Sequence, residues 1–356
     1  MSEERQGGRV SLLRAGSEAQ AEVSRSVRQK RTNASIFIPH LGCPHECSFC
    51  NKAAITQKEN SVTRASVREI LDRHVDTLRR KSMTAQIAFF GGTFTALDWD
   101  YREELLATAN EYLREYPDLF IGIRCSTRPD YINEAVLTQL KRGNVTSVEL
   151  GAQSMDDDVL RANNRGHDSA AVRTAAALIR EQGFELGLQM MTGLYGDTPD
   201  KSLYTCDEII KCAPATVRIY PTVVFRGTRL GELGHETFTL EQTVSLGAQI
   251  YGRFTEAGIR VIRIGLNPPP ERFNPDDIIG SYSPIVGDLI MSRYFFERMA
   301  AFMQDSGAKR FQVCTDRVFM SKISGHKGEN RTKLEQLGFT YKIKEKAGVE
   351  LEIYAV

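Results

Sequence analysis

The chain has no long apolar segment. None of its hydrophobic stretches approaches the roughly 20 residues that a helix needs to cross a bilayer, so a membrane protein is not expected. Residues 1–33 are polar and lack the apolar core of an export signal, which favours a cytoplasmic location. No internal repeat or low-complexity tract is present. With 41% hydrophobic and 26% charged residues, the composition is that of an ordinary globular protein.

Cysteine is scarce, and three of the seven cysteines stand in one short loop. Cys43, Cys47 and Cys50 lie in the segment Cys-Pro-His-Glu-Cys-Ser-Phe-Cys, directly after an apolar run. The odd count and the missing export signal argue against a disulfide framework. A structural zinc site is an alternative with His40 and His45 as competing ligands, but no paired ligands for it appear downstream.

Three thiolates at this spacing predict an iron–sulfur cluster. Such clusters are usually held by four cysteines, and here the fourth is missing. One iron of a cubane cluster would therefore have no protein ligand. An open metal position is where a substrate or cofactor binds.

Positive charge gathers near the two ends of the chain. The net charge is +1, yet residues 1–33 sum to +3, residues 307–346 to +6 and residues 34–306 to −6. Basic ends can bind phosphate backbones, and they can equally be solvated faces. The basic residues considered for an RNA-facing surface are Arg25, Arg28, Lys30, Arg31, Lys309, Arg310, Lys322, Lys327, Arg331 and Lys333.

Strand and helix patterns alternate from residue 34 to about residue 266. The expected strands are residues 36–41, 86–90, 120–125, 147–150, 185–191 and 217–224. The expected helices are residues 66–80, 101–116, 134–141, 170–182, 202–212 and 240–257. This repeated order predicts an α/β fold with a parallel sheet.

The pattern changes after residue 266, where three consecutive prolines force a turn or an extended passage. We expect a helix over 284–304, a strand over 311–314, a helix over 331–336, and a terminal hairpin of 339–344 with 350–354. The chain thus divides into a basic, flexible N-terminal arm (1–33), a barrel domain (34–266) and a small C-terminal α+β extension (267–356).

The motif Cys-x3-Cys-x2-Cys, with an aromatic residue before its last cysteine, resembles the signature of the radical S-adenosylmethionine superfamily. The resemblance implies a 4Fe–4S cluster whose open iron binds S-adenosylmethionine. An electron from a partner such as flavodoxin or ferredoxin then yields a 5'-deoxyadenosyl radical, which abstracts hydrogen from a substrate. Six strand–helix units match the partial, open (β/α)6 TIM-like barrel of that superfamily.

The resemblance also assigns cofactor contacts, which follow the expected strands at their carboxyl ends, where barrels of this class gather their active sites. Gly91, Gly92 and Thr93 form a turn that would approach the cofactor's ammonium group, although paired glycines can simply make a tight turn. Gln153 would reach the cofactor, and Arg165 would pair with its carboxylate unless it is a surface residue at a helix start.

Two aromatic and two polar positions complete the expected cofactor site. Phe49 and Phe37 match aromatic residues beside the cofactor, and either can equally be a core residue. Ser126 and Gln189 stand where relatives often place acids, so they would contact the ribose region without charge assistance.

The segment from Val217 to Thr228 resembles the sixth-strand region of the Elongator catalytic subunit, and residues 126–131 and 164–167 add to this likeness. That family modifies the wobble uridine of transfer RNA, but the chain has no room for its acetyltransferase domain. Tyr220 either lines the active site or relays a radical, or it is an inward aromatic residue. Two other functions stay open: a radical enzyme for a small metabolite or tetrapyrrole, and a non-catalytic haem or cluster carrier.

Overall fold

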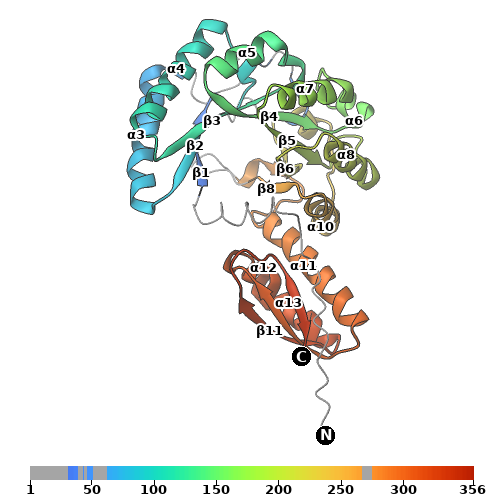
Figure 1. Cartoon of the computed structure of the whole chain (residues 1–356). Coiled ribbons are helices and arrows are strands. Elements are labelled where there is room, and N and C mark those ends of the chain that lie inside the picture. The colour runs from blue at the N-terminus through green and yellow to red at the C-terminus, as the bar shows by residue number, and fades with distance from the viewer. Residues whose placement is uncertain (1–30, 39–42, 44–45, 51–61, 267–274) are drawn as a thin grey trace. The chain divides into compact units, whose positions relative to one another are not determined.

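The computed structural model describes residues 31–38, 43, 46–50, 62–266 and 275–356 (Figure 1). Its contacts divide the chain into two compact units. The first, called here the barrel unit, comprises the described residues from Arg31 to Thr239 together with Ile259–Tyr282, and the second, the small unit, contains Leu240–Gly258 and Ser283–Val356. The domain boundaries expected at residues 33 and 266 stay predictions. Residues 1–30 of the expected N-terminal arm lie outside the described residues.

The barrel unit is built on one curved, seven-stranded parallel sheet (Figure 1). Its order along the sheet equals the order of these strands in the chain. The strands are β1 (Arg31–Phe37), β2 (Thr84–Phe90), β3 (Phe120–Thr127), β4 (Val145–Gln153), β5 (Glu185–Thr192), β6 (Thr216–Pro221) and β8 (Arg260–Ile264). All carboxyl ends therefore meet at one edge of the sheet, where the motif residues follow them.

Helices cover the convex face of this sheet (Figure 1). They are α3 (Arg64–Lys81), α4 (Trp99–Glu115), α5 (Glu134–Arg142), α6 (Asp157–Ala162), α7 (Ser169–Glu181) and α8 (Pro199–Lys211). A further short helix of this unit is α9 (Arg229–Glu232), whose Leu230 N–H donates to Ser48 O. Each of these helices begins after a side-chain cap that accepts a hydrogen bond from a backbone N–H of the first turn, which satisfies a donor the helix itself leaves unpaired. The caps are Thr63, Asp98, Asn133, Asp156, Asp168, Thr198 and Thr228.

The expected α/β fold with a partial, open barrel is confirmed, with three differences in detail. A seventh strand, β8, extends the sheet. Strand β1 begins at Arg31, five residues before the expected start, and residues 39–41 of the expected strand lie outside the described residues. The run expected over 217–224 breaks at Pro221, since proline has no N–H to continue the ladder. The remainder forms β7 (Val224–Phe225), antiparallel to β9 (Ile278–Ile279).

The small unit combines helices with a three-stranded sheet. Its elements are α10 (Leu240–Glu256), α11 (Val286–Asp305), β10 (Arg310–Thr315), α12 (Met320–Ser324), α13 (Glu329–Gln336), β11 (Thr340–Glu345) and β12 (Glu352–Ala355). The helix α10, expected to belong with the barrel, groups with α11. Across the described ranges, no helix is both long enough and apolar enough to cross a membrane.

The terminal hairpin expected from the sequence is wrong. Strand β10 lies between β11 and β12, parallel to the first and antiparallel to the second. The connecting segment passes around the end of β10, where the Lys346 N–H donates to Thr315 O (2.8 Å) and the Thr315 hydroxyl donates to Glu350 O (2.6 Å). This passage carries β12 to the far side of β10, which is therefore the central strand, with Phe311 and Val313 buried.

Candidate active site

The cysteine loop is held in place by loops that follow other strands. The Ser48 N–H donates to Asn163 O (3.1 Å), and Ser48 O accepts from the Leu230 N–H (2.9 Å). The Asn164 side chain donates to Glu46 O (2.9 Å). Ser48 is fully buried, so these backbone bonds are shielded from water. The loop is therefore fixed at the carboxyl edge of the sheet by segments more than 100 residues away in the chain.

The three cysteines of this loop are half-buried, and none of them forms a disulfide with another described residue. Cys43 Sγ lies 3.2 Å from the Thr93 hydroxyl, and Cys47 Sγ accepts from Arg165 Nη1 at 3.2 Å. In the part of the chain that the structure describes, no three His, Cys, Asp or Glu side chains converge on a point for a single metal ion. A cubane cluster binds its thiolates through different irons, so it does not require that convergence. Polar donors beside two sulfurs fit the hydrogen bonding that tunes such clusters.

Arg165 joins the cysteine loop to strand β4. Its Nη2 donates to Gly151 O (2.7 Å), while Nη1 contacts the sulfur of Cys47. Its Nε is buried and has no hydrogen-bond partner among the described residues. Arg128 donates to the Arg165 carbonyl and forms a two-pronged pair with Asp130 (2.9 Å for each bond), which fixes this turn. A buried guanidinium with an unused donor is a fitting site for a carboxylate.

The glycine turn after β2 packs against the end of β1. Gly91 has φ +101°, and a Cβ added there would lie 2.5 Å from a ring carbon of Phe37. Glycine is thus required both for the backbone conformation and for the close approach. Thr93, at the end of this turn, is buried beside Cys43. The structure therefore brings Phe37, Gly91, Thr93 and Cys43 together.

Polar side chains of β3, β4 and β5 line the same edge. Gln189 Nε2 donates to Gln153 Oε1 (2.8 Å), and Gln153 stands in the left-handed region (φ +67°) where β4 ends. The Ser126 hydroxyl donates to Glu149 Oε1 (3.2 Å), so a carboxylate lies next to the position where relatives often carry an acid. Phe49 and Gly92 are half-buried, and the structure shows no hydrogen bond or ring contact that links them to this group.

A buried ion-pair network lies on the concave face of the sheet, and its charged residues have no role in the site predicted from the sequence. Glu149 accepts from Arg218 Nε (2.7 Å) and pairs with Arg124 (3.6 Å). Arg124 also pairs with Glu185 (2.5 Å), and Arg218 Nη1 donates to the Tyr220 hydroxyl (3.3 Å). Burial acts to lower the pKa of Arg218, but the Glu149 carboxylate and the Tyr220 hydroxyl together outweigh burial and raise it. A sequence signal did exist, because Arg218 interrupts an apolar strand.

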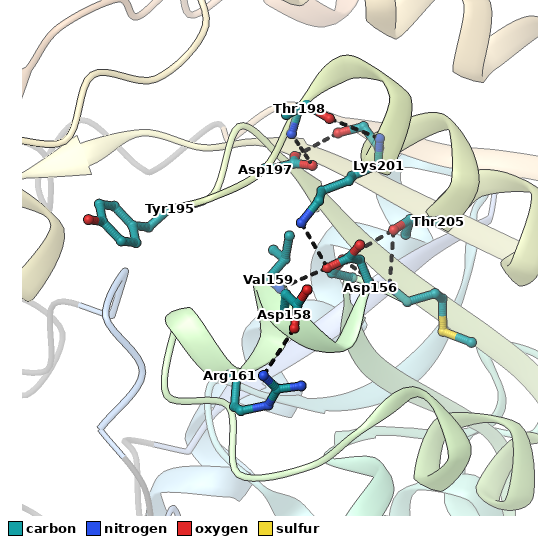
Figure 2. A network of polar contacts seen from close by, with 12 residues as sticks. Asp156, Asp158, Val159, Arg161, Tyr195, Asp197, Thr198, Lys201 and Thr205 are labelled. Atoms are coloured by element: carbon teal, nitrogen blue, oxygen red, sulfur yellow. Dashed lines mark hydrogen bonds and ion pairs between the residues drawn. The ribbon is translucent and has the colours of Figure 1, made fainter.

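A second polar network stabilises the loops after β4 and β5 (Figure 2). Asp156 accepts from Lys201 Nζ (3.2 Å), and Asp197 accepts from backbone groups of its own loop. Burial raises the pKa of Asp197 against these hydrogen bonds. The ring of Tyr195 points away from this network, while its backbone N–H and C=O both bond the Asn163 side chain (3.3 and 2.9 Å). Asn163 thereby connects this region to the cysteine loop.

His167, two residues after Arg165 in the chain, has a fully buried side chain. Its Nε2 lies 3.4 Å from Ala152 O, and its Nδ1 is among the buried polar atoms without a hydrogen-bond partner. Burial, followed by the positive charges of Arg165 and Arg128, lowers the pKa of His167 to about 4. The imidazole therefore stays neutral at neutral pH and adds no further charge to the site.

This shift makes folding depend on pH. The unfolded histidine binds a proton below its ordinary pKa of 6.5, whereas the folded one does so only near 4. The free energy of unfolding should therefore fall as the pH drops from about 6.5 towards 4, by roughly 2 kcal/mol between about pH 7.5 and pH 5. Replacing His167 with glutamine should abolish this part of the pH dependence of the free energy of unfolding. Denaturant titrations of both proteins at the two pH values measure it. Equal pH dependence in both proteins would contradict the assignment.

Comparison with known proteins places this geometry in a family. Residues 37–209 match the radical SAM superfamily, and residues 214–294 match the radical SAM C-terminal domain. The chain belongs to the radical SAM superfamily, whose members use a 4Fe–4S cluster and S-adenosylmethionine.

Within this superfamily, the chain is similar to Elongator complex protein 3. It is 32% identical to the Dictyostelium discoideum protein over 278 residues, which cover 70% of this chain and 47% of the relative. The human protein is 30% identical over 344 residues, 82% of this chain and 60% of the relative. A tRNA uridine(34) acetyltransferase of Dehalococcoides mccartyi is 27% identical over 56% of this chain and 50% of its own.

The chain spans about half the length of the curated relatives it matches. Among solved structures, Elp3 of the archaeon Methanocaldococcus infernus, with an N-terminal deletion, superposes with a TM-score of 0.60. That match has 19% identity and covers 78% of this chain and 64% of the archaeal one. It supports the fold described above.

Proposed function

We propose that the chain uses radical S-adenosylmethionine chemistry to modify a nucleoside of transfer RNA. The observation that carries the first part is Arg165, whose guanidinium joins the Cys47 sulfur to the end of β4 and keeps a buried donor unused. Three half-buried cysteines lie in the loop it contacts. The second part is supported by the names of the relatives, which include a tRNA uridine(34) acetyltransferase.

Each expected residue has a distinct task in this proposal. Cys43, Cys47 and Cys50 would hold the cluster through their thiolates, and the iron without a protein ligand would be available to S-adenosylmethionine. When reduced and bound, these two cofactors supply a 5'-deoxyadenosyl radical, with a small electron-transfer protein such as flavodoxin or ferredoxin as the electron source.

The remaining residues bind and orient S-adenosylmethionine. Arg165 donates to its carboxylate, since a guanidinium and a carboxylate match in a two-pronged hydrogen bond. The backbone carbonyls of the Gly91–Gly92 turn would accept from its amino group. Gln153, Gln189 and Ser126 supply hydrogen bonds for the ribose hydroxyls, and Phe37 and Phe49 shield the site from water. Tyr220 lines the substrate side.

RNA binding requires exposed positive charge, and the small unit provides it. Some of the cations expected at the RNA surface are engaged internally: Lys322 pairs with Asp288 (2.9 Å) and Lys333 with Glu329 (2.5 Å). Arg25, Arg28 and Lys30 lie outside the described residues, and Arg31 is exposed on β1.

A clearer basic surface lies on one face of the three-stranded sheet. Arg310, Lys342 and Lys344 are exposed. They lie on the same face, because Lys342 pairs in register with Gln312, which stands two residues after Arg310 on β10. Residues two apart on a strand share a face, and so do residues in register on neighbouring strands. These three cations form what we call the basic face. Positive side chains at this spacing can contact successive phosphates.

Charge reversal on the basic face should weaken binding of transfer RNA. In the variant Lys342→Glu/Lys344→Glu, the plot of log affinity against log salt should become less steep by roughly 0.7–0.9 for each lost phosphate contact. Fluorescence anisotropy across a salt series measures this slope. The control Arg73→Glu/Arg80→Glu changes the net charge equally on helix α3 and should keep the wild-type slope. An equal effect of both double variants would show that only net charge matters.

The experiment that tests the function is an anaerobic incubation of the reduced, cluster-loaded protein with S-adenosylmethionine and bulk transfer RNA. Nucleosides from digested RNA are then analysed by mass spectrometry. We expect a new mass on a uridine-derived nucleoside that is missing when S-adenosylmethionine is omitted. Unchanged nucleosides, together with negligible RNA affinity at low salt, would contradict the role in transfer RNA modification.

A further inference from the structure

Arg218 reaches across the interior of the barrel. It comes from β6, yet its guanidinium lies 5.0 Å from the ring centre of Phe90, the last residue of β2. These two strands are four places apart in the sheet. Such a contact can form only across the concave face of a curved sheet. Gly91 follows Phe90 directly in the chain. The guanidinium therefore lies close to the start of the Gly91–Gly92–Thr93 turn, which is predicted to bind the cofactor.

The guanidinium is fixed by its neighbours. Glu149 accepts from Nε (2.7 Å) and is itself held by Ser126 (3.2 Å) and Arg124 (3.6 Å). Nη1 donates to the hydroxyl of Tyr220, two residues nearer the carboxyl end of β6. The head group is therefore directed towards the edge of the sheet where the predicted site residues gather.

One donor of Arg218 remains unused. Only 8% of the residue is exposed. Its Nη2 has no hydrogen-bond partner among the described residues. It is also absent from the fully buried polar atoms that lack a partner, so it is not completely shielded from solvent. The Tyr220 hydroxyl accepts from Arg218, which leaves its own proton available for donation. Two donors are thus available near the carboxyl end of β6, separate from Arg165.

We propose that Arg218 and Tyr220 bind a carbonyl oxygen of the target base and select uridine over cytidine. This inference rests on the proposed function. Uracil carries an acceptor oxygen at the position where cytosine carries an amino donor. A guanidinium has donors only, so it pairs with the uracil edge and leaves the cytosine amino group unpaired. A site that hydrogen-bonds one acceptor atom of its substrate rejects an analogue without that acceptor. The buried polar groups of the site and of the analogue would then have no hydrogen-bond partners.

A purely structural role for Arg218 is the competing explanation. The Arg218–Glu149 pair would then only fill the barrel, and its loss would weaken binding of every RNA alike. Base discrimination separates the two, because a general loss of stability does not change the ratio of two affinities. The probe is therefore a pair of RNA hairpins that copy an anticodon stem–loop, with uridine or cytidine at the wobble position.

Affinities for both hairpins are measured by anisotropy with cluster-loaded protein and S-adenosylmethionine under anaerobic conditions. The wild-type protein should prefer the uridine hairpin by about tenfold. In Arg218→Met that ratio should fall to about one, and Tyr220→Phe should lower it in part. Arg218→Lys keeps the charge but loses the planar guanidinium, so its ratio of affinities should lie between those of the wild type and Arg218→Met.

Two further variants guard against misfolding. Glu149→Gln/Arg218→Met removes both buried charges together and should also show a ratio near one. Arg102→Met removes another buried arginine, which donates to Gln139 (2.6 Å) and lies outside the proposed site, and should keep the tenfold preference. Full discrimination in Arg218→Met, or equal binding of both hairpins by the wild type, would overturn this inference alone. Binding of neither hairpin by the wild type would overturn the proposed function as well.

Discussion

Replacing Cys43, Cys47 or Cys50 with alanine is expected to remove the iron–sulfur cluster completely. Each thiolate holds a different iron, and the cluster already lacks a fourth protein ligand. Two thiolates leave two irons open to solvent, so the cluster should not survive purification. Iron and sulfide analysis and the visible absorption of anaerobically reconstituted protein measure the loss. Cleavage of S-adenosylmethionine should disappear with it.

A cysteine outside the loop provides the matched control. Burial raises the pKa of the Cys212 thiol, which makes it a poor metal ligand. Cys212→Ala should therefore keep the wild-type iron content. If the wild-type protein, purified without oxygen, instead held one equivalent of zinc and no iron, the cluster assignment would be wrong.

Replacing Arg165 with methionine should weaken binding of S-adenosylmethionine while leaving the iron content unchanged. Loss of one charge-assisted pair typically costs about 2 kcal/mol. At 1.4 kcal/mol per decade, that cost corresponds to roughly 30-fold in the dissociation constant. Anaerobic isothermal titration of cluster-loaded protein measures this constant. Arg165→Lys should recover only part of the affinity, because an ammonium cannot form the two-pronged contact.

The matched control is Arg161→Met, which removes an arginine four positions earlier in the chain. Its side chain is 75% exposed and pairs only with Asp158 among the described residues. This variant should bind S-adenosylmethionine as the wild type does. Equal affinities of Arg165→Met and wild type would reduce Arg165 to a structural link between Cys47 and β4.

The order of elements in the barrel unit could be predicted because most strands are buried and apolar. Strand β8 was missed for the opposite reason: its five residues, Arg260–Ile264, include two arginines, and none of them is buried at the edge of the sheet. The terminal hairpin was wrong because neighbouring strands usually pair, and the sequence carries no signal that the chain passes around β10.

The candidate site, too, could be predicted from the sequence only in part. The cysteine motif and the turns after the strands are local patterns, and the sequence located them. Two of the three anchors of the cysteine loop are backbone groups, of Asn163 and Leu230, which almost any residue type would supply, and the third is the Asn164 side chain. The pair of Glu149 with Arg218 joins residues 69 positions apart and depends on the register of three strands. An arginine inside an apolar strand marks Arg218 as unusual, but its partner follows only from three-dimensional packing. The roles assigned to the site residues stay predictions.

The most direct test of the central claim is the formation of 5'-deoxyadenosine. The protein is reconstituted with iron and sulfide without oxygen, reduced with dithionite and incubated with S-adenosylmethionine. Our account predicts that 5'-deoxyadenosine and methionine appear together in equal amounts, and that neither appears with the Cys47→Ala variant. Fully cluster-loaded, reduced protein that leaves S-adenosylmethionine intact, with and without transfer RNA, would contradict it.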